Sequence, residues 1–192
     1  MPPKAKFTRE EIINAAFELT RAQGLEALTA RALGEKLGSS ARPIFSVFNS
    51  MEEVHSEVLN AARRHYTDFI NRGLRQTPPF RGVGIEYIRF AIDEPKLFML
   101  LFMSEQEEKP SINSILPVID ENYPQILKSI KNSFGLEDEQ AKRLYRHLWI
   151  YSHGIAVLCA TKLCSFTADE IEDMLTEVCV ALIRKIKGDK ND

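Results

Sequence analysis

The segment from Ser39 to Ser50 carries side chains suited to contact with nucleic acid. It contains one positive charge, Arg42, and no carboxylate. A guanidinium can donate two hydrogen bonds to O6 and N7 of guanine or can bind a backbone phosphate, and both possibilities stay open for Arg42. A helix that enters the major groove must keep carboxylates away from phosphates, and this segment does so. The residues expected to face base edges are Ala41, Arg42, Pro43 and Ser46.

Residues near this segment could bind backbone phosphates. Thr29 is expected to cap a short helix, and Ser39 and Ser40 are expected to cap the next, so that free amides and positive helix ends are available. The first fifty residues hold seven Lys and Arg and five Glu, a net charge of +2 in a chain whose net charge is −2. This asymmetry has the sign expected of a module that faces phosphates. The other residues predicted to contact DNA are Lys4, Lys6, Lys36, Phe45 and Asn49.

The sequence contains no recognisable motif for a catalytic or metal centre. It contains no GxSxG element, no phosphate-binding glycine loop and no HExxH pair. The three cysteines lack CxxC spacing and are interpreted as reduced core thiols. His153 lies among apolar residues and is interpreted as a core or interface histidine rather than a metal ligand. We therefore expect no enzyme activity, no cofactor and no metal.

Helix signals dominate the chain and predict an all-α fold of about nine helices. Three hydroxyl residues are each followed by Glu three positions later, which is the spacing of a capping box, namely Thr8/Glu11, Ser50/Glu53 and Thr167/Glu170. Helices are predicted after them, over about 9–23, 51–72 and 168–187. Two short helices are predicted between the first two, one ending at Gly38 and one over about 40–48. That is helix-turn-helix spacing and predicts a three-helix N-terminal domain.

The rest of the chain predicts a helical bundle. Helical patterning resumes after Pro79 and again at Pro95, and residues 105–110 are expected to form an exposed charged loop. Pro117 and Pro124 predict a kinked helix or two short ones between residues 114 and 133. A long helix is expected over 137–162.

Aromatic residues in the C-terminal part could line an apolar cavity for a small molecule, although helical spacing is also typical of a packed core. The residues predicted to bind a ligand are Phe69, Tyr87, Phe90, Phe98, Phe102, Tyr123, Trp149 and His153.

The last two predicted helices are apolar over more than one face. This pattern favours a second copy of the chain packed against them, although burial within a larger monomeric core would also produce it. The predicted dimer interface consists of Tyr151, Ile155, Leu158, Ile171, Leu175, Val178 and Leu182.

The N-terminal residues resemble the TetR-type bacterial transcriptional regulators. The resemblance is carried by residues 8–19, Gly24, residues 28–38 and residues 39–54. Trp149, His153 and Gly154 are similar to a Trp-His-Gly element in one subgroup of regulatory domains. The resemblance implies a DNA-binding domain over 1–50 and a ligand-binding and dimerisation domain over 51–192. It further implies a homodimer that represses a promoter through a palindromic operator, until a small apolar effector releases it.

Three residues depart from the TetR-type pattern. Phe45 stands where Tyr is common, Val47 where His or another aromatic residue is frequent, and Met51 where Lys is frequent. Since each lost phosphate contact flattens the log–log salt dependence of binding by about 0.9, we expect modest affinity and a weaker salt dependence than is usual for TetR-type regulators.

Composition limits the remaining function classes. Apolar runs fall far short of the roughly 18–20 residues of a membrane span, and no leader segment opens the chain, so we expect a cytoplasmic protein that does not act on a membrane. The alternatives to a DNA-binding regulator are a helical protein-interaction module and a helical-bundle enzyme.

Overall fold

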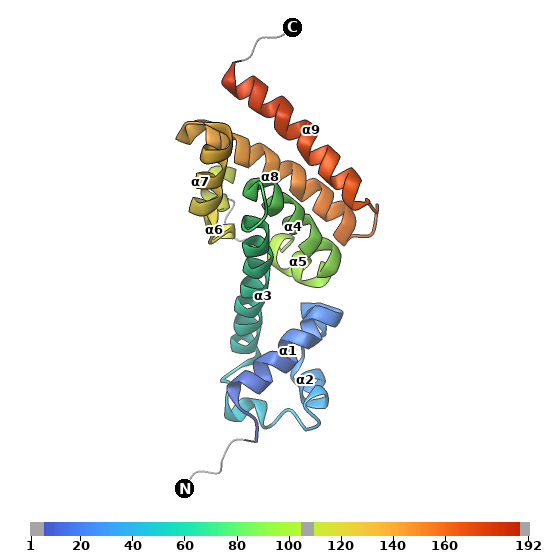
Figure 1. The fold of residues 1–192 in the computed structure, drawn as a ribbon. Helices are drawn as coiled ribbons and strands as arrows, with labels where there is room; N and C mark the ends of the chain where they lie inside the picture. Colours follow the sequence, from blue (N-terminus) through green and yellow to red (C-terminus); the bar gives the residue numbers. More distant parts are fainter. Residues whose placement is uncertain (1–5, 105–109, 189–192) are drawn as a thin grey trace. The chain divides into compact units, whose positions relative to one another are not determined.

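The computed structural model describes residues 6–104 and 110–188, and the regular structure within these ranges is helical. They form nine α-helices and two 3-10 helices (Figure 1). The chain folds into two compact units. The head unit consists of the described residues of Met1–His65 with Lys96–Ser104, and the body unit of those of Tyr66–Pro95 with Glu105–Asp192.

The head unit is built from short helices around one small core. Its elements are α1 (Arg9–Gln23), η1 (Leu25–Ala27), α2 (Ala30–Lys36), η2 (Ile44–Ser46), the first part of α3 (Met51–Leu74) and most of α5 (Pro95–Phe102). The core side chains recur at helical spacing along each element, as their sequence pattern predicts. They are Ile12, Ala16, Leu19, Leu28, Leu33, Ile44, Phe48, Val54 and Val58.

The body unit is a bundle centred on two packed helices. Its elements are the end of α3, α4 (Pro79–Asp93), α6 (Ile112–Ile119), α7 (Tyr123–Phe134), α8 (Asp138–Ala160) and α9 (Ala168–Lys187). Helix α4 packs against α7, α8 and α9, and α8 also packs against α6, α7 and α9. Figure 1 shows α8 and α9 lying side by side. Where α3 and α4 meet, Gly73 and Gly82 approach so closely that neither has room for a Cβ.

Two of the three predicted capping boxes are confirmed. At both Thr8 and Thr167 the hydroxyl accepts from the N3 amide, and the N3 carboxylate accepts from the cap amide. The prediction for Ser50 and Glu53 is only half right. The Ser50 hydroxyl accepts from the Glu53 amide at 3.4 Å, but the Glu53 carboxylate accepts from the Asn49 amide at 2.8 Å, one residue earlier than a box requires.

The two short helices predicted between residues 114 and 133 are α6 and α7, which Asp120 and the two residues after it separate. The predicted charged loop over 105–110 lies almost wholly outside the described residues. None of the helices within the described ranges is both long and apolar enough to cross a membrane.

Candidate nucleic-acid interface and apolar cavity

A tight turn connects α2 to the segment predicted to contact DNA. The Thr29 hydroxyl caps α2 by accepting from the Ala32 amide at 3.1 Å. After α2, the Ser39 amide donates to the Gly34 carbonyl at 2.9 Å. A Cβ on Gly34 would lie 2.8 Å from the Ser40 carbonyl carbon and 2.9 Å from the Ala41 nitrogen. Because backbone lies where a side chain would stand, only glycine fits, and this contact fixes the start of the segment against α2.

The helix predicted over residues 40–48 is much shorter in the structure. Only Ile44–Ser46 is helical, as the 3-10 helix η2. The Ser46 and Val47 amides donate to carbonyls three residues earlier, and the Phe48 amide donates to Ile44 in the α pattern. The Ser46 hydroxyl also donates to the Pro43 carbonyl at 2.6 Å, a local bond that competes with continued helix. The segment is therefore one tight helical turn whose Ile44 and Phe48 side chains are anchored in the head core.

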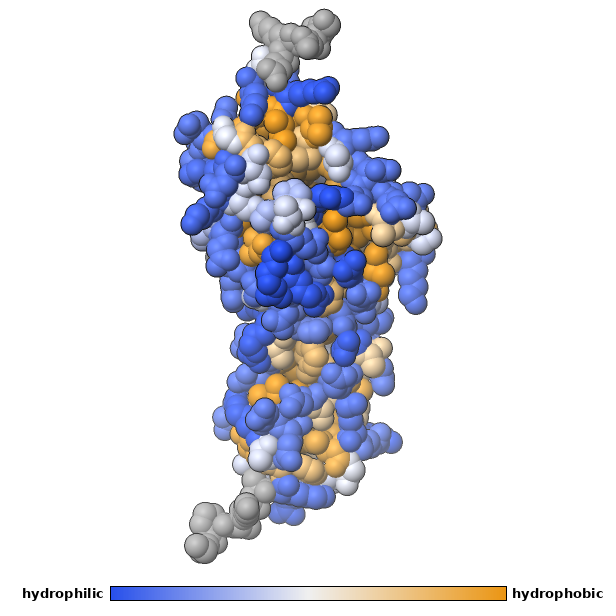
Figure 2. Space-filling model, in the orientation of Figure 1, coloured by the Kyte–Doolittle hydropathy of each residue, from blue (hydrophilic) through white to orange (hydrophobic). Residues whose placement is uncertain are grey.

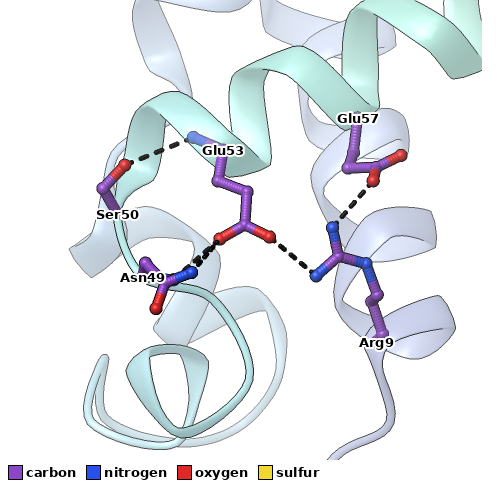
Figure 3. Close-up of polar contacts among 5 residues, drawn as sticks. All are labelled: Arg9, Asn49, Ser50, Glu53 and Glu57. Atoms are coloured by element: carbon purple, nitrogen blue, oxygen red, sulfur yellow. Dashed lines mark hydrogen bonds and ion pairs between the residues drawn. The ribbon is translucent and has the colours of Figure 1, made fainter.

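Arg9 joins the end of this turn to α3 (Figure 3). Its guanidinium donates to Glu53 at 2.9 Å and to Glu57 at 2.7 Å. The other Glu53 oxygen accepts from the backbone and side-chain amides of Asn49 at 2.8 and 3.1 Å. Arg9 also lies 4.3 Å from the ring centre of Phe48, within cation–π range. Hydrogen bonds from Asn49 and then Arg9 lower the pKa of Glu53, so this anchor persists into mildly acidic solution.

The structure brings most of the predicted DNA-contacting residues to the surface of the head unit. The exposed ones are Lys6, Thr29, Lys36, Ser40, Arg42, Phe45, Ser46 and Asn49. Ser39, Ala41 and Pro43 are half-buried. Lys6, which precedes α1, donates to the Ser39 hydroxyl at 3.0 Å and so reaches this same surface. Lys4 lies outside the described residues.

A cavity of about 200 Å³ lies within the body unit. Its wall draws on α3, α4, α7, α8, α9 and the turn after α6, so helices distant in sequence enclose it. Most of its wall is apolar or aromatic, and the residues that line it are Tyr66, Pro78, Phe80, Arg81, Val83, Gly84, Tyr87, Asp120, Phe134, Tyr145, Leu148, Trp149, Ser152, Leu175, Thr176, Cys179, Val180 and Ile183.

Of the eight residues predicted to bind a ligand, the cavity wall includes Tyr87 and Trp149. His153 lies behind them, since its Nδ1 is 2.8 Å from the Tyr87 hydroxyl and its ring stacks on Trp149 at 4.9 Å. Burial lowers the pKa of His153, which favours the neutral ring. The remaining five residues are not part of the wall. Phe69 and Phe90 pack on each other, Phe98 and Phe102 pack together within the head unit, and Tyr123 packs on Tyr145.

The cavity wall also contains polar groups that the sequence did not single out. Asp120 is 2% exposed and its carboxylate accepts from the Tyr66 hydroxyl at 3.4 Å and the Asn122 amide at 2.9 Å. Burial raises the pKa of Asp120 to about 6. The Trp149 Nε1 is buried and has no hydrogen-bond acceptor among the described residues. An apolar cavity with a few polar groups is typical of a small-molecule site.

The residues predicted to form a dimer interface differ in burial. Ile155, Ile171 and Leu175 are buried within the single chain, whereas Tyr151, Leu158, Val178 and Leu182 are half-buried. Two further apolar side chains on the same helices are exposed, Ile150 at 50% and Val180 at 42%. Figure 2 shows apolar surface between charged residues on the unit that contains α8 and α9.

No group of three or more His, Cys, Asp or Glu side chains that could hold a metal ion occurs in the part of the chain that the structure describes.

Part of the head unit matches a known protein family. Residues 12–58 match the family described as bacterial regulatory proteins, tetR family. Two solved structures from Rhodococcus sp. RHA1 share the fold. One, a transcriptional regulator, is 13% identical with a TM-score of 0.63 and covers 93% of this chain and 97% of its own. The other, a TetR-like transcriptional regulator, is 14% identical with a TM-score of 0.60, over 98% and 100%. No curated protein matches the chain.

Proposed function

We propose that the chain is a TetR-type, DNA-binding transcriptional regulator, because residues 12–58 match the tetR family of bacterial regulatory proteins. We further propose that it is a dimeric repressor whose operator binding is released by a small apolar effector. Residues 1–50 bind the DNA, and residues 51–192 bind the effector and form the dimer. The family is not enzymatic, in agreement with the lack of a catalytic motif in the sequence. The protein acts in the cytoplasm on promoter DNA.

The observation that carries the DNA-binding proposal is the exposed turn after α2. The side chains of Ser40, Arg42 and Ser46 are exposed, whereas Ile44 and Phe48 on the same turn are buried. A rigid turn that presents a guanidinium and hydroxyls, with no carboxylate between Ser39 and Ser50, suits a groove lined by base edges and phosphates. Lys6 and Lys36 add exposed positive charge to the head unit, where backbone phosphates would lie.

The dimer supplies the second head that a palindromic operator requires. The half-buried and exposed apolar residues of α8 and α9, including Tyr151, Leu158, Val178 and Val180, form the proposed contact between two copies. Helix-turn-helix dimers place their heads about 34–36 Å apart or at a multiple of that distance.

The cavity supplies the proposed effector site. Helix α3 contributes residues to both units, so it is the element through which occupation of the cavity reaches the head. An effector that binds one spacing of the two heads better than the other shifts the population away from the DNA-competent dimer.

Equilibrium binding to duplex DNA tests this function. Duplexes selected from a random pool or from chromosomal fragments are titrated with wild type and with the double variant Lys36→Glu, Arg42→Glu. Arg143→Glu is the matched control, because Arg143 is an exposed arginine of the body unit. We expect the double variant to lose specific binding and the control to keep it.

Two results would refute the proposal. One is equal affinity of the wild type for selected and random duplexes at moderate salt. The other is undiminished operator binding by the folded double variant, which would favour a protein-interaction role for the head.

A further inference from the structure

The cavity of the body unit has one buried charged group in a wall that is mostly apolar and aromatic. Asp120 ends α6 and is 2% exposed. Its two oxygens accept one hydrogen bond each from Tyr66 and Asn122, and it forms no ion pair with any Lys, Arg or His of the described ranges. A buried carboxylate is costly unless a cation or several donors compensate it, and two neutral donors leave part of its accepting capacity unused.

Aromatic side chains line the same cavity as this carboxylate. The Tyr66 hydroxyl donates to Asp120 at 3.4 Å, and Tyr87 and Tyr145 line the same cavity. Burial and then the negative charge of Asp120 raise the pKa of all three tyrosines well above the usual value. Tyr87 in turn lies 6.1 Å from Trp149 between ring centres. Tyrosine and tryptophan rings attract cations through their faces, so the rings and the carboxylate favour the same sign of ligand charge.

The cavity wall also contains one cation, Arg81, which argues for the opposite ligand charge. Arg81 is ion-paired with Glu172 on α9, and both side chains are partly exposed. Its charge is therefore already compensated within the chain, in contrast to that of Asp120.

We propose that the cavity takes a small apolar molecule that carries a protonated amine, with Asp120 as the counterion and the tyrosine and tryptophan rings of the cavity wall against the apolar part. This assignment rests on the proposed role of the cavity as the effector site and specifies the chemical class of the effector. A bound ammonium group replaces the missing partner of Asp120 and lowers the pKa of its carboxyl from about 6.

Three probes with one skeleton test the proposal on the full-length protein. They are 4-phenylbutan-1-amine, 4-phenylbutan-1-ol and 4-phenylbutanoate, which share a phenyl ring and a four-carbon chain and differ in the end group, which is cationic, neutral or anionic at about pH 8. At about pH 8 the amine is protonated and Asp120 is ionised. Binding is followed by the fluorescence of Trp149, the single tryptophan of the chain, and by calorimetry.

Asp120→Asn removes the proposed counterion and keeps an acceptor for the Asn122 amide. Glu121→Gln is the matched control, because Glu121 is exposed, adjacent in sequence and absent from the cavity wall. On wild type we expect the amine to bind roughly tenfold or more tightly than the alcohol, and the carboxylate most weakly. The Asp120→Asn variant should bind the amine and the alcohol equally. An alcohol affinity equal to that of wild type would show that its cavity is intact. The Glu121→Gln variant should still bind the amine more tightly than the alcohol.

The ranking of probes on wild type decides the proposal even where Asp120→Asn fails to fold. An amine that binds no tighter than the alcohol overturns it, as does preference for the carboxylate, which would assign the site to Arg81. Failure of all three probes at millimolar concentration also overturns it, and so does an amine preference that survives in folded Asp120→Asn.

Operator binding, measured on the same preparations, separates this proposal from the proposed function. If the cavity prefers the amine but the protein binds no DNA specifically, the proposed regulator function is refuted and the proposed ligand class is supported. If the protein binds DNA specifically but shows no amine preference, the ligand class is refuted and the regulator function is supported.

Discussion

The contact between Gly34 and the following turn yields the sharpest stability prediction. Replacing Gly34 with alanine places a Cβ 2.8 Å from the Ser40 carbonyl carbon and 2.9 Å from the Ala41 nitrogen. Ordinary carbon contacts lie at about 3.5–4.0 Å, so the backbone of the turn must move by more than about half an ångström. The neighbouring atoms are backbone, and no side-chain rotation can relieve the overlap.

The expected free-energy change combines two opposing effects. Overpacking of a tight site costs about 1–3 kcal/mol, and we take the upper end because the neighbours are backbone. Alanine in place of a helical glycine gains about 1 kcal/mol of helix propensity. Gly34→Ala should therefore lower the free energy of unfolding by about 2 kcal/mol. It should also weaken DNA binding, because Ser40 and Ala41 are displaced.

Gly154→Ala is the control for the helix-propensity effect. Gly154 lies inside α8, and a Cβ there would meet no neighbouring side chain or other helix of the described residues within 4 Å. This variant should be up to about 1 kcal/mol more stable than wild type. Urea denaturation followed by circular dichroism measures both changes. A Gly34→Ala protein as stable as wild type would refute the claim that α2 and the turn are in tight backbone contact.

Four further predictions follow from the same structure. Thr167→Ala should destabilise the protein by about 1 kcal/mol in urea denaturation, because α9 loses its N-cap hydroxyl. Arg9→Ala should lower the thermal midpoint at low salt, and its difference from wild type should narrow at high salt, where Coulombic attraction to Glu53 is screened. Burial raises the pKa of Asp120 in the folded state from 3.8 to about 6, so the folded state binds this proton more tightly than the unfolded state does. Protonated Asp120 therefore stabilises the fold below pH 4, and this stabilisation is lost as the pH rises through about 6. Relative to wild type, Asp120→Asn should gain up to about 3 kcal/mol between pH 4 and pH 7 in chemical denaturation. The log–log salt slope of operator binding should be shallower than about −6 by equilibrium titration, and a steeper slope would contradict the loss of phosphate contacts at Phe45 and Met51.

Elements governed by local hydrogen bonds were predictable from the sequence. The bounds of α1 and α9 follow from the Thr8 and Thr167 capping boxes and from the apolar positions after them. The box at Glu137 and Gln140, which starts α8, was missed because glutamate is an unusual N-cap residue.

The form of the DNA-contacting turn could not be predicted from its apolar spacing. Ile44, Val47 and Phe48 recur at i, i+3 and i+4, which suits an α-helix and also a single 3-10 turn. Ile44 and Phe48 lie in the head core, and the length of the helix depends on the Ser46 side chain and on the close approach of Gly34.

The sequence predicted that an apolar cavity exists but not which residues line it, because the lining depends on how helices distant in sequence pack together. Aromatic composition indicated an apolar site, and of the eight residues it named, Tyr87 and Trp149 line the cavity. Asp120 stands between Ile119 and Glu121 and has the sequence signature of an exposed loop, so its burial follows only from the packing of α6 and α7. The wall residues of α9, such as Leu175 and Cys179, lie on a face that the sequence assigned to a dimer partner or core.

Hydroxyl-radical footprinting of a selected operator tests the central claim most directly. Two identical protected half-sites should appear, centred one helical turn (about 34–36 Å) or a multiple of it apart, because two copies of the turn that carries Arg42 dock together. Protection should vanish in Arg42→Glu and persist in Arg143→Glu. A single protected patch, or a footprint unchanged in folded Arg42→Glu, would contradict the account.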